Sequence, residues 1–212
     1  SGFKSEALVF ESAQGKFELS KTIAEAYMNL PEFKSHLDDL IKTGLLINFD
    51  RYRVDVLFTV GRQYSRKDVS RLLNWQSNMY STIYGYRLDP ETNSCPLFVT
   101  LEKSEEVSAS TAYGDSLIDP QNMLWFTKSN RTLSSKVEAD IANNLVDIYV
   151  FAKKNDAEGS GHYFLGKAKA SNAENSTMFD GNAKQIPVVK MNLRFEEPVQ
   201  AALFDYFHSS LD

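Results

Sequence analysis

The spacing of apolar residues changes near residue 53, and this change divides the chain into two parts. Before it, residues 17–29 and residues 32–46 carry apolar side chains three and four positions apart. Pro31 stands where a second helix would begin, and Gly44 stands near its end. We therefore expect residues 1–50 to form an antiparallel helical hairpin whose apolar faces are largely covered within the pair.

Beyond residue 53 the pattern is that of strands, with β-branched and aromatic runs separated by turn-forming residues. The segment 171–184 is the most polar long connection. The strand candidates are residues 54–60, 82–87, 96–102, 123–128, 147–153, 162–170 and 187–195. Alternation along these segments predicts that the following side chains face the interior: Val54, Val56, Phe58, Leu97, Val99, Ile148, Val150, Phe164, Val188 and Leu193.

Two further helices are indicated. Ser65 followed by Asp68 is a capping-box pair and predicts a short helix bearing Val69 and Leu72, while Pro198 predicts a last amphipathic helix. The predicted fold is α+β: residues 51–212 form a mainly antiparallel β-barrel or bent sheet, preceded by the helical hairpin and closed by a C-terminal helix.

Composition argues against several classes of function. Three histidines and one cysteine are a small stock for catalysis, and no histidine pair has metal-ligand spacing, so we expect no catalytic residue, metal or cofactor. The segment Gly161–Lys167 has the glycine spacing of a phosphate loop, but Ala168 replaces the hydroxyl residue and the intervening residues are strand formers. This fragment is therefore not expected to be an enzyme.

Location is indicated by what the chain lacks. No apolar run approaches the roughly twenty residues of a membrane span, and a single Cys95 cannot form an internal disulfide. Ser1-Gly2 carries no signal-peptide feature and resembles a cloning remnant. We expect a piece of a larger cytoplasmic protein with no membrane partner.

Charge is distributed unevenly. The net charge is −5, yet residues 51–87 hold seven basic and two acidic residues and also carry many aromatic rings. Cations that contact phosphates, together with rings that stack on unpaired bases, are typical of nucleic-acid surfaces. Lys67 and Arg71 are four residues apart and share a helix face. The candidate binding residues are Arg62, Tyr64, Arg66, Lys67, Arg71, Trp75, Tyr84, Tyr86 and Trp125.

A plainer interpretation remains open for the same residues. Tyr84 and Tyr86 alternate as core residues of a strand would, and Arg66, Lys67 and Arg71 form an ordinary solvated helix face in that interpretation. The two interpretations differ in whether the rings and cations converge on one concave surface.

Several motifs together resemble a known family. They occur in the order TVGRQYSRKDVSRLLNW, STIYGYR, CPLFVTLEK, STAYGD, LWFTKSNRTLSS, DIYVFAKK and HYFLGK. Residues 53–205 resemble the uncharacterised C-terminal domain of bacterial superfamily 2 helicases, which are often joined to a phospholipase-D-like nuclease module. The helical segment before it resembles the linker that follows the helicase core.

The resemblance implies a context. The parent chain would be an ATP-dependent helicase of restriction or defence type, with nuclease activity in its other module, and the helicase core would be one partner of this domain. DNA, including single-stranded DNA or DNA with a modified base, would be the other. By analogy of architecture the bent sheet would be a reader of the PUA, SRA or B3 kind. The alternative is a protein-interaction or autoinhibitory scaffold of the same helicase, which the acidic overall charge permits.

Overall fold

A computed structural model describes residues 8–11, 15–53, 55–76, 80–102, 114–179 and 184–209. Its contacts divide the chain into two compact units, residues 1–53 and residues 54–212. Each unit is described by itself.

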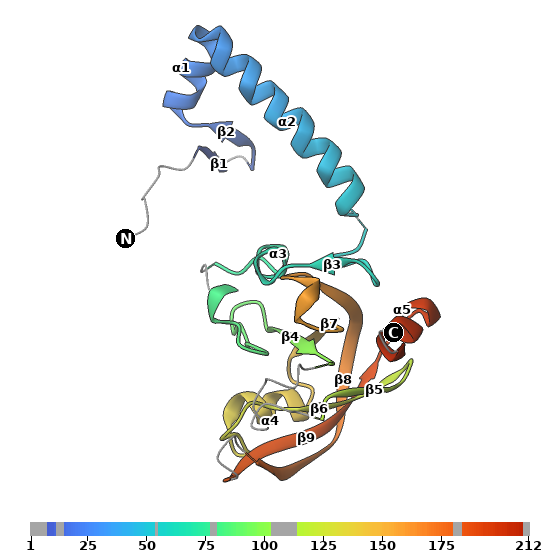
Figure 1. Cartoon of the computed structure of the whole chain (residues 1–212). Helices are drawn as coiled ribbons and strands as arrows, with labels where there is room; N and C mark the ends of the chain where they lie inside the picture. The colour runs from blue at the N-terminus through green and yellow to red at the C-terminus, as the bar shows by residue number, and fades with distance from the viewer. Residues whose placement is uncertain are drawn as a thin grey trace. The chain divides into compact units, whose positions relative to one another are not determined.

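The first unit contains the predicted pair of helices and a small strand pair (Figure 1). Strand β1 (Val9–Glu11) pairs antiparallel with β2 (Phe17–Leu19), so residues 17–19 are a strand and not the start of a helix. Helix α1 spans Lys21–Asn29 and α2 spans Pro31–Arg51. The Tyr27 hydroxyl donates a hydrogen bond of 2.8 Å to Asp38 Oδ1 and joins the two helices.

The prediction that the helices cover their own apolar faces is wrong. Leu40, Leu45 and Phe49 are 68%, 64% and 93% exposed, and no described residue of this unit is buried. Helix α1 has 9 residues and α2 has 21, so they are about 14 Å and about 32 Å long at 1.5 Å per residue. The shorter helix can therefore cover only the first half of the longer one.

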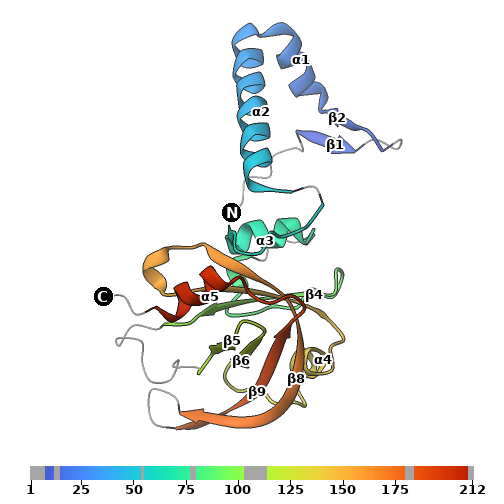
Figure 2. The same ribbon diagram turned by 90° about the vertical axis from the view of Figure 1, so that its right-hand side faces the viewer.

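The second unit is built on a curled, half-barrel sheet (Figure 2). The strand order is β4-β7-β8-β9-β6-β5, and β3 pairs with β8 outside this path. Every pair is antiparallel except β4–β7, which confirms the predicted α+β fold with a mainly antiparallel bent sheet. The strands are β3 (Gln63–Tyr64), β4 (Ser94–Thr100), β5 (Ser116–Asp119), β6 (Asn122–Phe126), β7 (Asp147–Lys153), β8 (His162–Phe179) and β9 (Gln185–Phe195).

Helices lie around the sheet. The short helix α3 (Arg66–Leu72) has the predicted capping box, in which Ser65 Oγ accepts from the Asp68 amide and the Asp68 carboxylate accepts from the Ser65 amide. Helix α4 (Lys136–Ala142) was not predicted, and α5 (Ala201–His208) begins three residues after Pro198. Single 3-10 turns occur at η1 (Tyr80–Thr82) and η3 (Asp156–Glu158). No helix among the described residues is long and apolar enough to cross a membrane.

Three segment predictions are wrong. Residues 55–60 and 82–87 are not strands: Phe58 lies in an irregular segment and packs its ring against other rings, and Gly85, with φ of +72°, interrupts the other segment, in which Tyr86 forms a single bridge with Leu97. Residues 171–179 were expected to be a connection but continue β8, because backbone pairing with β9 does not depend on side-chain polarity. The segment resembling a phosphate loop lies in β8 from His162 onward.

The sheet is buried on both faces at β7, which explains the unbroken apolar run of this strand. Ile148, Val150 and Ala152 face the main core, which also receives side chains from α4 and α5. Tyr149 and Phe151 face the other side and pack against an aromatic cluster around Phe58. The predicted interior residues are buried, with two exceptions: Val56 is 41% exposed, and Val54 lies outside the described residues.

A chain shortened to residues 51–212 is expected to stay folded. The main core and the aromatic cluster consist of residues from Phe58 onward, so deletion removes no member of either. Circular dichroism and thermal unfolding of the shortened and full chains should show transitions within a few degrees of each other. An insoluble or unfolded shortened chain would contradict the division into two units.

Candidate nucleic-acid interface

Three adjoining cavities lie beside the half-barrel sheet, and the first of them is lined by residues of edge strand β4 and of β6. The first, of about 350 Å³, is here called the aromatic pocket, and the aromatic residues among those that line it are Tyr84, Tyr86, Phe98, Trp125 and Phe126. The second, the cationic cleft, measures about 460 Å³, and the third, the α3 groove, about 610 Å³. The pocket shares Arg66 and Tyr84 with the α3 groove, and it shares Tyr86 and Lys128 with the cationic cleft. The three cavities therefore form a continuous surface.

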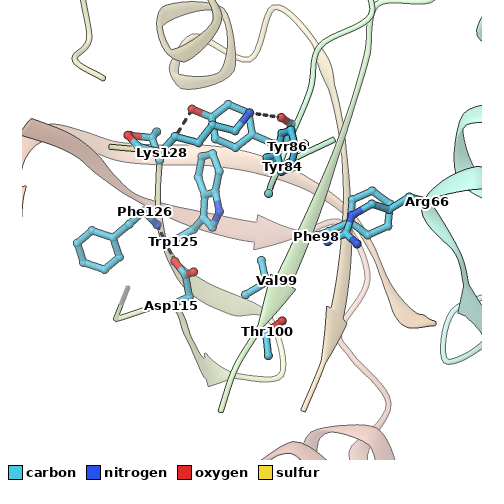
Figure 3. A pocket seen from close by; sticks show the side chains of 12 residues that line it. Arg66, Tyr84, Tyr86, Phe98, Val99, Thr100, Asp115, Trp125, Phe126 and Lys128 are labelled. Atoms are coloured by element: carbon cyan, nitrogen blue, oxygen red, sulfur yellow. Dashed lines mark hydrogen bonds between the residues drawn. The ribbon is translucent and has the colours of Figure 1, made fainter. Parts of the chain in front are cut away.

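The inner wall of the aromatic pocket is formed by the packed side chains of Tyr86 and Trp125 (Figure 3). The rings of Tyr86 and Trp125 meet edge to face with centroids 5.1 Å apart, and both side chains are less than 5% exposed. Strand β6 directs Trp125 inward, and the Asp115 carboxylate accepts a hydrogen bond of 2.9 Å from the Phe126 amide on the same strand. Both buried rings line the pocket, and little of either side chain is exposed.

Tyr86 is held in place at three points. Its hydroxyl donates to the carboxylate of Glu138, which is 2% exposed, and its carbonyl oxygen accepts a bond of 2.6 Å from Lys128 Nζ. The same ammonium lies 4.4 Å from the centroid of the Tyr86 ring. Burial, and then the bond to Glu138, raise the pKa of the Tyr86 phenol, so this wall of the pocket stays neutral.

Two cations lie at the edges of the pocket. The Arg66 guanidinium lies 5.1 Å from the Phe98 ring centroid, and its buried Nε has no hydrogen-bond partner within the described part of the chain. Burial lowers the pKa of Arg66, and burial followed by repulsion from Arg131 lowers the pKa of Lys128. An anion beside either group would compensate for lost hydration.

The structure brings together five of the nine residues proposed from the sequence. Arg66, Lys67 and Tyr84 line the α3 groove, and Tyr84, which is 74% exposed, separates it from the aromatic pocket. Tyr86 and Trp125 also line the aromatic pocket, although both residues are buried. Both earlier interpretations therefore apply to these two rings, because they are core residues and pocket walls at once.

The other four residues lie elsewhere. Tyr64 and Trp75 are 3% and 9% exposed, and their polar atoms are used internally: the Tyr64 oxygen accepts from the Thr59 amide, and Trp75 Nε1 donates to Ser94 Oγ. Neither ring can reach a ligand in this conformation. Arg62 and Arg71 are exposed, but they line none of the three cavities.

Sequence reasoning missed most of the cationic cleft. The cations of the cleft lie in irregular connections and at the start of the unpredicted helix α4, so no periodic pattern in the sequence connects them. Phe98 was assigned only to a strand. The missed side chains are Arg87, Phe98, Lys128, Arg131 and Lys136.

Cys95 is fully buried, which raises the pKa of its thiol to about 12. Among the described residues, no group of three or more His, Cys, Asp or Glu could hold a metal ion. The described side chains that line the three cavities include aromatic rings and positive charges.

Comparisons with known proteins identify one family model. A model described as a domain of unknown function, DUF3427, matches residues 58–207. No curated protein matches the chain by sequence.

Solved structures with a similar fold are remote in sequence. The modification-dependent restriction endonuclease AspBHI is 15% identical with a TM-score of 0.44, over 70% of this chain and 77% of that chain. The sulfur-binding and SRA domains of ScoMcrA, solved with phosphorothioated DNA, are 12% identical with a TM-score of 0.44, over 91% and 63%. MspJI restriction endonuclease, solved with an oligonucleotide, is 10% identical with a TM-score of 0.40, over 53% and 31%. The chain thus spans less than two thirds of the ScoMcrA and MspJI chains.

Proposed function

The chain belongs to the DUF3427 family, and we propose that its second unit is a noncatalytic DNA-recognition module. The observation that carries this proposal is the continuity of the aromatic pocket with two cation-lined cavities. Rings that expose one face bind bases by stacking, and fixed cations bind phosphates. The pocket volume lies within the range of about 300–1,000 Å³ that is typical of ligand sites.

The depth of the pocket favours a base outside the duplex stack. Its inner ring, Trp125, is 3% exposed, whereas the outer ring of Tyr84 is 74% exposed. A base paired in a duplex cannot reach a recessed ring, but an unpaired or extruded base can enter between the two. The proposed ligand is therefore single-stranded DNA, or duplex DNA with a modified or damaged base that unpairs easily.

A longer parent chain completes the proposal. The resemblance to the C-terminal domain of superfamily 2 helicases supports placing this module after a helicase core, in a bacterial restriction or defence protein of the cytoplasm. ATP hydrolysis, and nuclease activity where a nuclease module is present, would then belong to other parts of that chain. The role of this unit would be to deliver those activities to selected DNA.

The direct test is binding of the full 212-residue chain to labelled single-stranded, duplex and modified-base oligonucleotides across a salt series. We expect affinity that falls as salt rises, with a residual preference for unpaired or modified bases at high salt. Absence of DNA affinity even at low salt would overturn the proposed function.

Tyr84→Ala should weaken binding of an oligonucleotide with one unpaired base by about 1–3 kcal/mol, because a stacking face is lost. The salt dependence should hardly change, since no charge is removed. Tyr84 is 74% exposed, so thermal unfolding should be nearly unaffected. Tyr84→Phe is the matched control and should retain most of the affinity. Equal affinities of wild type and Tyr84→Ala would remove Tyr84 from the binding surface.

The alternative function is a protein-interaction or autoinhibitory scaffold, and the exposed apolar side chains of α2 favour it. Leu45, Leu46 and Phe49 are 64%, 74% and 93% exposed, which is unusual for a helix without a partner. Its discriminating measurement is binding to the helicase core of the parent chain. If the domain is a scaffold, Leu45→Lys should lose binding to the helicase core. If it is a DNA reader, the same variant should keep its affinity for DNA.

A further inference from the structure

We propose that the cationic cleft is a phosphodiester-binding subsite that holds the DNA backbone next to the base in the aromatic pocket. This inference rests on the proposed DNA recognition and adds a second site to it. Residues that the sequence did not single out carry it: Arg87, Lys128, Arg131 and Lys136.

The four cations come from separate segments and converge on one cavity. Arg87 directly follows the pocket residue Tyr86, Lys128 and Arg131 lie in the connection after β6, and Lys136 is the first residue of α4. Lys136 is exposed, and the side chain of Arg131 is 50% exposed. The guanidinium of Arg87 is oriented by a bond of 2.8 Å from its Nη1 to Thr82 Oγ1. These side chains can therefore contact a ligand in the cleft without a change in the fold.

Positive charge in the cleft exceeds negative charge. The acidic residue that lines the cleft is Glu138, whose side chain is 3% exposed and accepts a hydrogen bond from the Tyr86 hydroxyl. Its Oε1 lies 3.7 Å from Arg131 Nε, an ion pair rather than a hydrogen bond. One buried carboxylate faces four cations, which leaves a formal excess of three positive charges.

Burial and neighbouring positive charge both act on Lys128. Burial contributes most to the lowered pKa of Lys128, and repulsion by Arg131 and Arg87 adds to it, while Glu138 and Cys95 oppose the shift. Like charges that line one cavity repel each other until a counter-charge arrives. A phosphate, with oxygens that accept from guanidinium and ammonium donors, relieves this repulsion.

The position of the cleft fits a backbone rather than a separate anion. Tyr86 and Lys128 line both cavities: the Tyr86 ring is a wall of the aromatic pocket, and its hydroxyl points to Glu138 on the cleft side. In a nucleotide the phosphate is attached to the base through the sugar, so its site must adjoin the base site. The shared wall provides this adjacency.

The experiment compares two variants that each remove two positive charges. Arg131→Gln with Lys136→Gln alters the cleft, whereas Lys169→Gln with Arg194→Gln alters an exposed cross-strand pair on β8 and β9 outside the three cavities. The probe is a labelled duplex with one unpaired base. In a second probe, an uncharged methylphosphonate replaces the phosphate beside that base, and in a third it replaces a distant phosphate. Affinities are measured by fluorescence anisotropy across a salt series.

The cleft variant should bind the first probe roughly tenfold more weakly than wild type at moderate salt, with a salt slope smaller by about two units. Wild type should lose affinity for the probe with the adjacent methylphosphonate but much less for the distant one. The cleft variant should not distinguish these two probes, because the contact is already gone. The control variant should behave like wild type in this comparison.

Two outcomes separate the inference from the proposed function. If wild type binds DNA but the cleft and control variants behave alike, the subsite is overturned and DNA recognition stands. If wild type binds none of the probes, DNA recognition fails and the subsite fails with it.

Lys136→Glu serves as the second variant, because Lys136 is exposed and its replacement leaves the Arg131–Glu138 pair intact. If Lys136→Glu unfolds at the same temperature as wild type and also binds DNA with the same affinity, the subsite is overturned.

Discussion

Replacing Trp125 by alanine should lower the free energy of unfolding by about 3–5 kcal/mol. The indole is 3% exposed and belongs to the main core, where it packs edge to face against Tyr86. Its removal leaves a void beside a ring that the fold holds at three points, so the neighbours cannot collapse into it. Urea denaturation followed by circular dichroism measures the loss.

Tyr84→Ala is the matched control for this substitution. Both rings line the aromatic pocket, but Tyr84 is 74% exposed and should change the free energy of unfolding by less than about 0.5 kcal/mol. Comparing the two substitutions separates the contribution of a ring to stability from its contribution to DNA binding at the same cavity. If Trp125→Ala lowers the free energy of unfolding by less than about 1 kcal/mol, the inner wall of the pocket is loosely packed. DNA binding of Trp125→Ala must be measured well below its own unfolding temperature.

Acidification from pH 6.5 to pH 4 should destabilise the protein through His162 by about 3 kcal/mol. The His162 side chain is 1% exposed, its Nδ1 lies 3.2 Å from the Ser160 carbonyl oxygen, and its buried Nε2 has no partner among the described residues. Burial, and then the charges of Arg66 and Lys153, lower the pKa of His162 from 6.5 to about 4, against an opposing effect of Asp156.

The sign of the effect follows from the proton uptake of the two states. Above pH 6.5 the imidazole is neutral in both the folded and the unfolded chain, so it contributes no pH dependence. Between pH 6.5 and 4 the unfolded chain binds a proton that the folded chain excludes, and stability falls as the pH is lowered. His162→Asn keeps a donor near Ser160 and does not titrate, so its unfolding free energy should fall less over this range. Parallel pH curves for wild type and His162→Asn, or an NMR titration of His162 near 6.5, would contradict the prediction.

Local sequence patterns determined much of the second unit. The apolar run of β7 predicted its bounds, residues 147–153, because a strand buried on both faces needs apolar side chains at every position. Ser65 and Asp68 predicted the start of α3, since a capping box depends on residues three positions apart. The local charge of residues 51–87 also placed Arg66, Lys67 and Tyr84 among the binding candidates. All three line the cavities.

Only the tertiary structure decided which rings and cations meet. Tyr64 and Tyr84 have the same side-chain chemistry, yet one is 3% exposed in a core cluster and the other is 74% exposed at the pocket. Arg87, Lys128 and Lys136 are brought to one cleft by the curling of the sheet and the placement of α4, which are long-range features. Local propensity cannot encode such a convergence, because it depends on packing between segments up to about fifty residues apart. The sequence by itself therefore determined the elements and the sign of the charge near the site, and the fold determined the site.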